Sequence, residues 1–287
     1  MVNVSEVSAA TCPACGSAAT LDEDYLPDRL HRCESCRMLF ASEAHSQALK
    51  ELYDSEYFSN YTGGEDYERN DRQRRFEAEL RVGLLQRHGA RGDLLELGSA
   101  SGHFLDEARG AGFSVKGIEP VAGVAGRAAE RFDVEVIPRF LEEVDLPAEG
   151  FDVVCAWHVL EHVADPRDVL GRVLGALRPG GLLFLEVPNI GSVSARRRKR
   201  AWKPLDPEHH MAHYTAAALE AMLEGVGYTM VAIETFPLLG YVRPRRLIEP
   251  IVAASQVKET LTLQTVPRRP HPWKHDLLRT VARKPGA

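Results

Sequence analysis

Four cysteines near the start of the chain have a spacing that suits a metal ion. Cys12, Cys15, Cys33 and Cys36 form two C-x2-C pairs, separated by 17 residues. Two such knuckles can present four thiolates tetrahedrally to one zinc ion, and a site filled by four protein ligands has no open position for catalysis. The spacing therefore predicts a zinc ribbon in which the metal is structural.

A turn bracketed by glycines offers a second kind of chemistry. It occupies residues 98–102 (GSASG), between an apolar run and a sequence suited to a helix. Glycines let the backbone approach a ligand closely, and exposed N–H groups at a helix start favour an anionic group. Glu119 ends the next apolar run, 21 residues after Gly98, where a carboxylate can accept hydrogen bonds from both hydroxyls of a ribose. A dinucleotide site would prefer G-x-G-x-x-G, so the turn alone is a weak signal.

Two segments supply histidines that could act on a proton. The histidines are His158 and His162 in WHVLEHV, and His209, His210 and His213 in PEHHMAHYT. A histidine at the carboxyl edge of a sheet is a candidate general base. His162, beside Glu161, is expected to fix the loop instead. The second group has i, i+1, i+4 spacing without a nearby carboxylate or cysteine to complete a metal site, which disfavours metal binding there.

The elements that position these residues follow a regular rhythm. From Asp93 to Asn189, short apolar runs alternate with helical stretches, which predicts an α/β fold with a parallel sheet and helices on both faces. A helix is expected to end near Gly89 before this region. After it, a helix from about Ala216 to Glu224, closed by glycines, a strand near 228–234 and a final edge strand in LLRTVARKP are expected.

Five ordered blocks of sequence resemble a known family. They are LLELGSASGHFL, GIEP, FDVVCAWHVLEHVADP, LRPGGLLFLEVPN and HHMAHYTAAALEAMLEGVGY, which together cover about residues 93–235. In these blocks the chain is similar to the class I S-adenosylmethionine-dependent methyltransferases, in the branch that contains ubiquinone-type and small-molecule enzymes. The resemblance implies a Rossmann-like fold with a mainly parallel seven-stranded sheet and S-adenosylmethionine as cofactor. Ala100 departs from the family, in which a glycine is frequent at that position.

The resemblance also implies roles for individual residues. It puts the methionine part of the cofactor against Gly98, Ser99 and Gly102, the ribose on Glu119, the adenine near Pro120, Phe140 and Leu141, and the methyl donor beside Trp157 and His158. Ordinary core packing is the alternative for Phe140 and Leu141. His210 best matches the family's acceptor-side histidine, followed by His158 and His213. A base with an ordinary pKa near 6.5 would give a rate that rises between about pH 5.5 and 7.5.

The expected organisation has three parts. Residues 1–45 form the zinc-ribbon module, 46–90 a helical and aromatic segment that covers the cofactor site, and 91–287 the methyltransferase domain. Within that domain, an insertion is expected near 190–212 and an irregular segment near 236–276.

Three functions remain open from the sequence. The first is O- or C-methylation of a small molecule in natural-product or cell-envelope sugar biosynthesis. The second is an RNA or protein methyltransferase that docks through the ribbon and the basic run Arg196 to Arg200, and the third is a non-catalytic cofactor-binding partner. The basic run would suit an anionic or carrier-bound acceptor. A net charge of −6 argues against a nucleic-acid enzyme.

The composition bounds the class of protein. The chain has 287 residues and 44% hydrophobic content, enough for one large core and a small module. No run of 18 apolar residues and no signal-like start is present, so no membrane span and a cytoplasmic location are expected. Five cysteines are too few for a disulfide scaffold, and Cys155, in an apolar run, is expected to be a small buried hydrophobe. The oligomeric state is left open.

Overall fold

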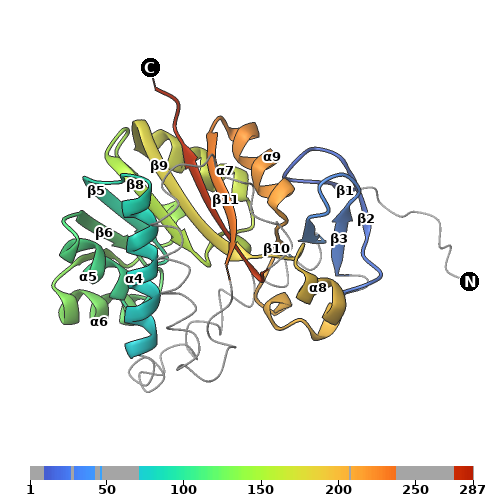
Figure 1. Ribbon diagram of the computed structural model, residues 1–287, viewed down its shortest axis with the longest axis horizontal. Coiled ribbons are helices and arrows are strands. Elements are labelled where there is room, and N and C mark those ends of the chain that lie inside the picture. Colours follow the sequence, from blue (N-terminus) through green and yellow to red (C-terminus); the bar gives the residue numbers. More distant parts are fainter. Residues whose placement is uncertain are drawn as a thin grey trace, which may run out of the picture.

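The structure is a computed structural model that describes residues 10–26, 29–42, 46, 71–206, 208–236 and 275–286. Residues 47–70 of the expected helical and aromatic segment at 46–90, and most of the irregular segment at 236–276, lie outside these residues. The described part contains two sheets, a large one flanked by helices and a small one at the N-terminal side of the molecule (Figure 1).

The large sheet has seven strands in the order β11-β12-β9-β8-β5-β6-β7. The strands are β5 (Asp93–Leu97), β6 (Ser114–Ile118), β7 (Glu135–Ile137), β8 (Phe151–Trp157), β9 (Leu177–Pro188), β11 (Thr229–Phe236) and β12 (Leu277–Arg283). Strands β5 to β9 pair in parallel, whereas β12 runs antiparallel to both of its neighbours. The prediction of a mainly parallel seven-stranded sheet is confirmed.

Helices cover both faces of this sheet (Figure 1). They are α4 (Asp71–Arg87), α5 (His103–Gly110), α6 (Ala122–Phe132), α7 (Pro166–Ala176) and α9 (Ala216–Val226). Buried side chains of α4 and α5 form one apolar cluster against the sheet, and those of α7 and α9 belong to another. Cys155 is fully buried in the first cluster, as expected.

Two expectations about the C-terminal part need correction. The last strand, β12, is not an edge strand, because it lies between β9 and β11. Its side chains explain the position: all but the last of its residues are buried, whereas an edge strand would leave one side to solvent. Gly225 does not close α9 but lies within it, and Gly227, with φ 115°, forms the C-cap.

The small sheet joins the cysteine-rich module to the main domain. Its strands are β1 (Ala10–Thr11), β2 (Ala18–Leu21), β3 (Leu30–Cys33), β4 (Leu39–Ala41) and β10 (Ala212–His213), in that order. Strand β10 comes from the segment that carries the later histidines, and it pairs antiparallel with β4, with His213 opposite Leu39. The N-terminal module is therefore continuous, through backbone hydrogen bonds, with the segment that carries the later histidines.

The segment between β9 and β10 is helical and packs on the small sheet. It contains α8 (Val193–Arg198) and two short 3₁₀ helices, η4 (Lys199–Ala201) and η5 (Lys203–Leu205). Trp202 is buried there in a cluster with Tyr25 and Leu30 of the N-terminal module. This packing fixes the segment beside the carboxyl end of β9.

Candidate active site

The glycine turn after β5 has the backbone shape that its sequence predicts. Gly98 and Gly102 have φ values of 65° and 77°, in the left-handed region that glycine adopts without strain. A Cβ atom on Gly98 would lie 2.6 Å from Cγ2 of Val159, so no larger residue fits. Ala100 also has a positive φ, 45°, and pays a conformational cost of about 1 kcal/mol at a position where the family often has glycine.

Glu119, at the end of β6, faces this turn. Its two carboxylate oxygens accept hydrogen bonds from the backbone N–H groups of Ala100 at 2.9 Å and Val121 at 3.1 Å. The side chain is 7% exposed, and burial raises its pKa while these two N–H groups oppose the rise. Each oxygen keeps a lone pair that a ribose hydroxyl could use.

The side chains of three expected cofactor residues, Ser99, Phe140 and Leu141, differ in their exposure. Ser99 is 4% exposed, and its hydroxyl points under the turn toward Gly117, where it has no hydrogen-bond partner within the described part of the chain. Only its backbone can meet a ligand in the turn. Phe140 is 39% exposed, so its core-packing alternative is wrong, whereas Leu141 is partly buried against the core.

A buried ion-pair network that the sequence analysis did not identify lies beside His158. Glu186, near the end of β9, accepts hydrogen bonds from Arg81 of α4 at 2.7 Å and from Arg279 of β12 at 2.5 Å. Burial opposes ionisation, but the two arginines outweigh it and hold the pKa of Glu186 well below its usual value. The available signal was a charged residue in each of two apolar runs, LLFLEVP and LLRTVA.

His158 lies at the end of β8, held between two carboxylates. Its Nδ1 lies 3.1 Å from Glu161 Oε1, and its Nε2 lies 3.3 Å from Glu186 Oε1. Burial disfavours its charged form, but these acids prevail and raise its pKa to about 9. The ring is therefore an imidazolium at neutral pH, with no lone pair to accept a proton. Trp157, the preceding residue, is buried, with Arg81 over its ring.

His210 and His213 are more deeply buried than a base in contact with solvent would be. The Nδ1–H group of His210 donates to the carbonyl of Pro204 at 3.0 Å, which leaves Nε2 as the unprotonated nitrogen. Burial lowers the pKa of His210 to about 3, so the ordinary value assumed from the sequence does not apply. His213 is completely buried and donates from Nε2 to the carbonyl of Leu205.

The histidines do have a carboxylate neighbour, contrary to the sequence analysis. Glu161, His162 and His210 each offer one potential ligand atom, and these atoms lie within 4.8 Å of one another. Glu161 is distant in sequence but is brought beside His210 because Met211 N–H donates to the Glu161 carbonyl at 2.8 Å. Two histidines and a carboxylate can hold a metal, so the reason given from sequence against such a site was wrong.

Comparison with known proteins identifies the family. Residues 67–233 match a protein family described as "Methyltransferase domain", and this match covers more than half of the chain. The chain belongs to this methyltransferase family.

Individual relatives agree with this assignment. A ubiquinone biosynthesis O-methyltransferase of Rhodopseudomonas palustris is 30% identical over 47% of this chain and 57% of its own length. The C-methyltransferase NovU of Streptomyces niveus is 30% identical over 56% of this chain and 37% of its own length. The chain thus spans about half or less of these curated relatives.

Solved structures share the fold. A Thermotoga maritima structure titled as a SAM-dependent methyltransferase and possible histamine N-methyltransferase has a TM-score of 0.56 at 17% identity, covering 77% of this chain and 95% of that one. The 1,6-didemethyltoxoflavin-N1-methyltransferase of Burkholderia thailandensis, solved with bound 1,6-didemethyltoxoflavin and S-adenosylhomocysteine, has a TM-score of 0.56 at 18% identity, covering 90% of this chain and 99% of that one. These similarities confirm the Rossmann-like methyltransferase fold.

The four N-terminal cysteines of the chain converge on one point. The Sγ atoms of Cys12 and Cys36 are 3.6 Å apart, those of Cys15 and Cys33 are 3.4 Å apart, and all four lie within 4.8 Å of one another. Thiolates around tetrahedral zinc lie about 3.8 Å from one another, as follows from a Zn–S distance of about 2.3 Å. The four side chains therefore fit one zinc ion.

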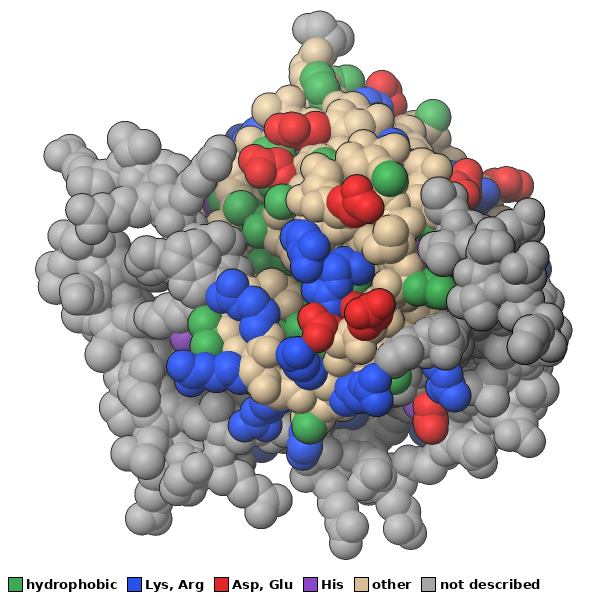
Figure 2. All heavy atoms as spheres, turned by 90° about the vertical axis from the view of Figure 1, so that its right-hand side faces the viewer, with side chains coloured by type: hydrophobic (Ala, Val, Ile, Leu, Met, Phe, Trp, Pro, Cys, Tyr) green, Lys and Arg blue, Asp and Glu red, His purple; other side chains and the backbone are tan. Residues whose placement is uncertain are grey.

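The basic run of the methyltransferase is exposed on the face that carries the small sheet. Arg196 to Arg200 are all exposed, and Figure 2 shows Lys and Arg side chains gathered on this side of the molecule. Within the described residues, Lys199 forms an ion pair with Asp24 of the N-terminal module at 2.6 Å. No helix in the described part of the chain is long and apolar enough to cross a membrane.

Proposed function

We propose that this protein is an S-adenosylmethionine-dependent methyltransferase that methylates a small molecule on oxygen or carbon. The observation that carries the proposal is Glu119, held by two backbone N–H groups beside a glycine turn at the carboxyl edge of a parallel sheet. This arrangement suits a nucleoside with a free ribose, and family membership supports S-adenosylmethionine as that nucleoside.

In this proposal, different residues around the turn bind different parts of the cofactor. In this proposal Glu119 holds the ribose, the backbone of Gly98, Ser99 and Gly102 receives the methionine part, and the adenine lies near Pro120, Phe140 and Leu141. The Phe140 side chain is 39% exposed, and aromatic rings stack on bases. When bound, the cofactor supplies a methyl group on a positively charged sulfur.

On the acceptor side, the proposal makes His210 the base or the orienting group. Its Nδ1–H is fixed on a backbone carbonyl, so Nε2 is the nitrogen that can accept a hydrogen bond or a proton from the acceptor, and a pKa of about 3 favours the hydrogen bond. His158 and His213 are weaker candidates. Both ring nitrogens of His158 face carboxylates, and His213 is completely buried.

The four cysteines are proposed to hold a structural zinc ion. All four ligand positions would be filled by Cys12, Cys15, Cys33 and Cys36, so the ion would have no open position for the acceptor. Its contribution would be the fold of the N-terminal module, whose small sheet is too short to be stable without a staple.

Two curated relatives support a small-molecule acceptor, since one is named an O-methyltransferase of ubiquinone biosynthesis and the other a C-methyltransferase. The exposed basic run Arg196 to Arg200 favours an acceptor that is anionic or carrier-bound.

The same basic run supports a second candidate, an RNA or protein methyltransferase that docks through this face. The net charge of −6 weighs against it. Retention on immobilised RNA that falls steeply with salt, and is lost on replacing Arg196, Arg197 and Arg198 by Ala, would favour this candidate.

Calorimetry with S-adenosylhomocysteine tests the proposed cofactor site. Replacing Glu119→Ala is expected to weaken binding by at least about tenfold, or about 1.4 kcal/mol, because the ribose loses its acceptor. Glu130→Ala, an exposed acid on the adjacent α6, is the matched control and should leave affinity unchanged. Equal affinity of the Glu119 variant and the wild type would mean that the site is misplaced. Turnover across a panel of phenols, keto sugars and their carrier-bound forms then tests the acceptor class.

A further inference from the structure

A basic face is formed jointly by two parts of the chain. One part is the exposed run Arg196 to Arg200 in α8 and η4, and the other is the exposed Arg37, directly after the second cysteine pair. The two parts meet at Asp24. Its carboxylate accepts a hydrogen bond from Lys199 at 2.6 Å, and this bond, together with the charges of Arg32 and Arg37, lowers its pKa. Figure 2 shows the Lys and Arg side chains gathered on this side of the molecule.

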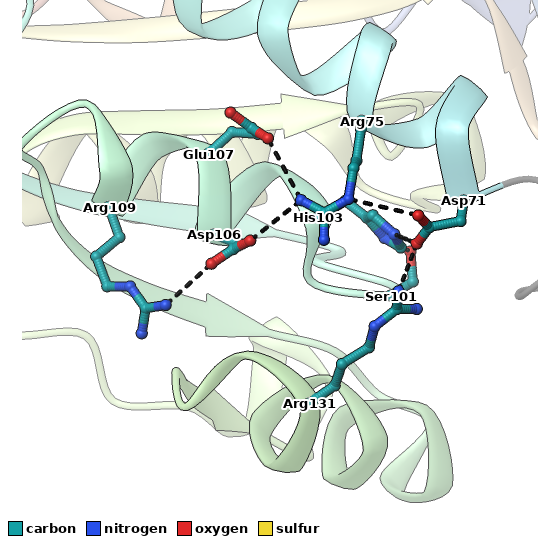
Figure 3. A network of polar contacts seen from close by, with 8 residues as sticks. All are labelled: Asp71, Arg75, Ser101, His103, Asp106, Glu107, Arg109 and Arg131. Atoms are coloured by element: carbon teal, nitrogen blue, oxygen red, sulfur yellow. Dashed lines mark hydrogen bonds and ion pairs between the residues drawn. The ribbon is translucent and has the colours of Figure 1, made fainter.

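The basic face differs from another charged cluster, at the start of α4. There, Arg75 lies within 3.5 Å of three carboxylates, those of Asp71, Asp106 and Glu107, so its charge is compensated within the chain (Figure 3). Among the members of the basic run, only Lys199 has an ion-pair partner within the described residues. The run therefore keeps a surplus of positive charge that the packing of the chain does not use.

The basic face is connected directly to the proposed acceptor end. Just beyond the run, the carbonyl of Pro204 accepts the hydrogen bond from His210 Nδ1 at 3.0 Å, and the next carbonyl, of Leu205, accepts one from His213 at 2.6 Å. Trp202 is buried in the cluster that joins this segment to the N-terminal module. A partner bound on the basic face thus contacts the segment that orients the acceptor-side histidines.

The distribution of the cations fits an extended acidic surface. The arginines are exposed and belong to two separate parts of the chain, so each can pair with a different carboxylate of a partner. A small anion is instead held by donors that converge on one point. Exposed charges of one sign also steer a partner of opposite charge toward the face before contact is made.

The aromatic residues beside the basic face disfavour RNA as the partner. Tyr25 and Trp202 are 3% and 2% exposed, so neither ring is available to stack on a base. Recognition of single-stranded RNA depends on such stacking as well as on positive charge. An acidic protein surface needs only the charge.

We propose that the basic face docks the acidic surface of a carrier protein to which the acceptor is covalently attached. Carboxylates of the carrier pair with Arg196, Arg197 and Arg198, and the attached acceptor enters near His210. The inference rests on the proposed function, because it requires an acceptor to be methylated at that end. The competing explanation is that the run is a solvated loop without a partner.

Fluorescence anisotropy with two labelled probes separates these explanations. The probes are an acidic acyl carrier protein and a uridine oligonucleotide of about 20 nucleotides. We expect the carrier protein to bind, with an affinity that falls as salt is added. Arg196→Ala/Arg197→Ala/Arg198→Ala should weaken this binding by at least about tenfold, because three exposed ion pairs are lost. Replacing the same three residues by Lys keeps the charge and should keep the affinity within about threefold.

The matched control removes three exposed arginines elsewhere. Arg91→Ala/Arg109→Ala/Arg127→Ala changes the net charge equally, and two of its positions lie on α5 and α6, far from the small sheet (Figure 1). This variant should leave the affinity for the carrier protein within about twofold, because long-range charge effects are screened by salt.

Turnover gives a second readout. For an acceptor linked to the carrier protein, the triple-alanine variant of the run should raise KM by about tenfold or more and leave kcat within about twofold. For the same acceptor in free, uncharged form, both constants should stay within about twofold. A loss of kcat for both forms would show that the run supports the fold of the acceptor end, and the inference would be wrong.

The remaining outcomes also decide. Tighter binding of the oligonucleotide than of the carrier protein, lost in the same variant, would overturn the inference in favour of RNA. Binding of neither probe, or equal losses in the variant and its control, would leave the run a solvated loop. S-adenosylhomocysteine is titrated into the same samples. If the wild-type protein does not bind it, the proposed function is refuted, whereas binding of S-adenosylhomocysteine without binding of the carrier protein overturns the inference alone.

Discussion

The proposed cofactor end and the proposed acceptor end of this chain are built from different kinds of contact. At the cofactor end, the decisive hydrogen bond joins Ala100 to Glu119, and both belong to one β-α-β unit. At the acceptor end, Met211 N–H donates to the Glu161 carbonyl, and the Met211 carbonyl accepts from Ala41 of the N-terminal module. The first end can form within the main domain, whereas the second depends on a separate module.

The N-terminal module supports the acceptor side at several points. Besides the pairing of β4 with β10, Thr215 donates to the Cys36 carbonyl at 2.6 Å. Arg167 of α7 donates to the carbonyls of Pro13 and Ala14, within the first cysteine knuckle. The cysteine cluster is therefore tied directly to the segment that carries His210.

Removal of zinc is the strongest test of this difference. Because metal binding supplies the folding free energy of small zinc modules, the variant Cys15→Ser/Cys33→Ser is expected to lose the N-terminal module and, with it, the acceptor-side strand β10. Turnover of any acceptor should fall by more than about 100-fold, while S-adenosylhomocysteine affinity stays within about threefold. Zinc content by elemental analysis and hydrogen exchange at residues 208–214 should change together.

A Cys155→Ser variant is the matched control, because Cys155 lies in the core of the main domain and outside the cluster. If β10 remained protected from hydrogen exchange in zinc-free protein, the proposed dependence of the acceptor end on the N-terminal module would be wrong. Less than half an equivalent of zinc in folded wild-type protein would remove the zinc proposal itself.

Replacing His210→Ala tests the acceptor end alone. If Nε2 accepts the acceptor's proton, turnover is expected to fall by about 10² to 10⁴ while cofactor affinity is unchanged. Because burial lowers the pKa of His210 to about 3, the wild-type rate should show no rise from this residue between about pH 5.5 and 7.5. A variant that unfolds more easily but turns over normally would show that His210 only packs.

The backbone shape of the glycine turn and the position of Glu119 could be predicted from the sequence because their determinants are local, and the role of these residues in cofactor binding stays a prediction. Gly98 and Gly102 have positive φ values, which glycine adopts without strain. Glu119 must lie at the end of the next strand to reach this turn. The alternation of apolar runs and helical stretches was enough to predict five parallel strands and their helices. The placement of β12 was missed, because alternation along the chain does not reveal which strand inserts between two others.

The acceptor end could not be predicted because its contacts join distant segments. Nothing local in PEHHMAHYT shows that His213 pairs with Leu39, or that Glu161 lies beside His210. The depressed pKa of His210 follows from burial, which the alternation pattern does not report. The same applies to the ion pairs of Glu186, which bring together α4, β9 and β12.

Glu186 joins α4, β9 and β12 beside His158, and removing its charge is expected to destabilise the main domain. Glu186→Gln leaves Arg81 and Arg279 without a counter-ion in a buried site, at a cost of about 3 to 5 kcal/mol in the free energy of unfolding. Urea denaturation measures the loss. Glu234→Gln, which breaks a partly exposed pair with Arg87, is the matched control and should cost at most about 1 kcal/mol. Equal losses of unfolding free energy for the two variants would show that the buried ion pairs of Glu186 stabilise the fold no more than the exposed pair does.

The smallest expected effect concerns the charge on His158. Its pKa is about 9 in the folded protein, against about 6.5 when unfolded, so the folded state holds the proton more tightly. The resulting stabilisation is fully present below about pH 6.5 and is lost as the pH rises toward 9. The difference in unfolding free energy between the wild type and His158→Asn should therefore shrink across this window. His88→Gln provides the contrast, because burial lowers the pKa of His88 and its contribution changes only below about pH 6.5. A His158 difference that stays constant from pH 6.5 to 9 would mean that its ring is neutral in the folded protein, and His158 would then compete with His210 as the proton acceptor.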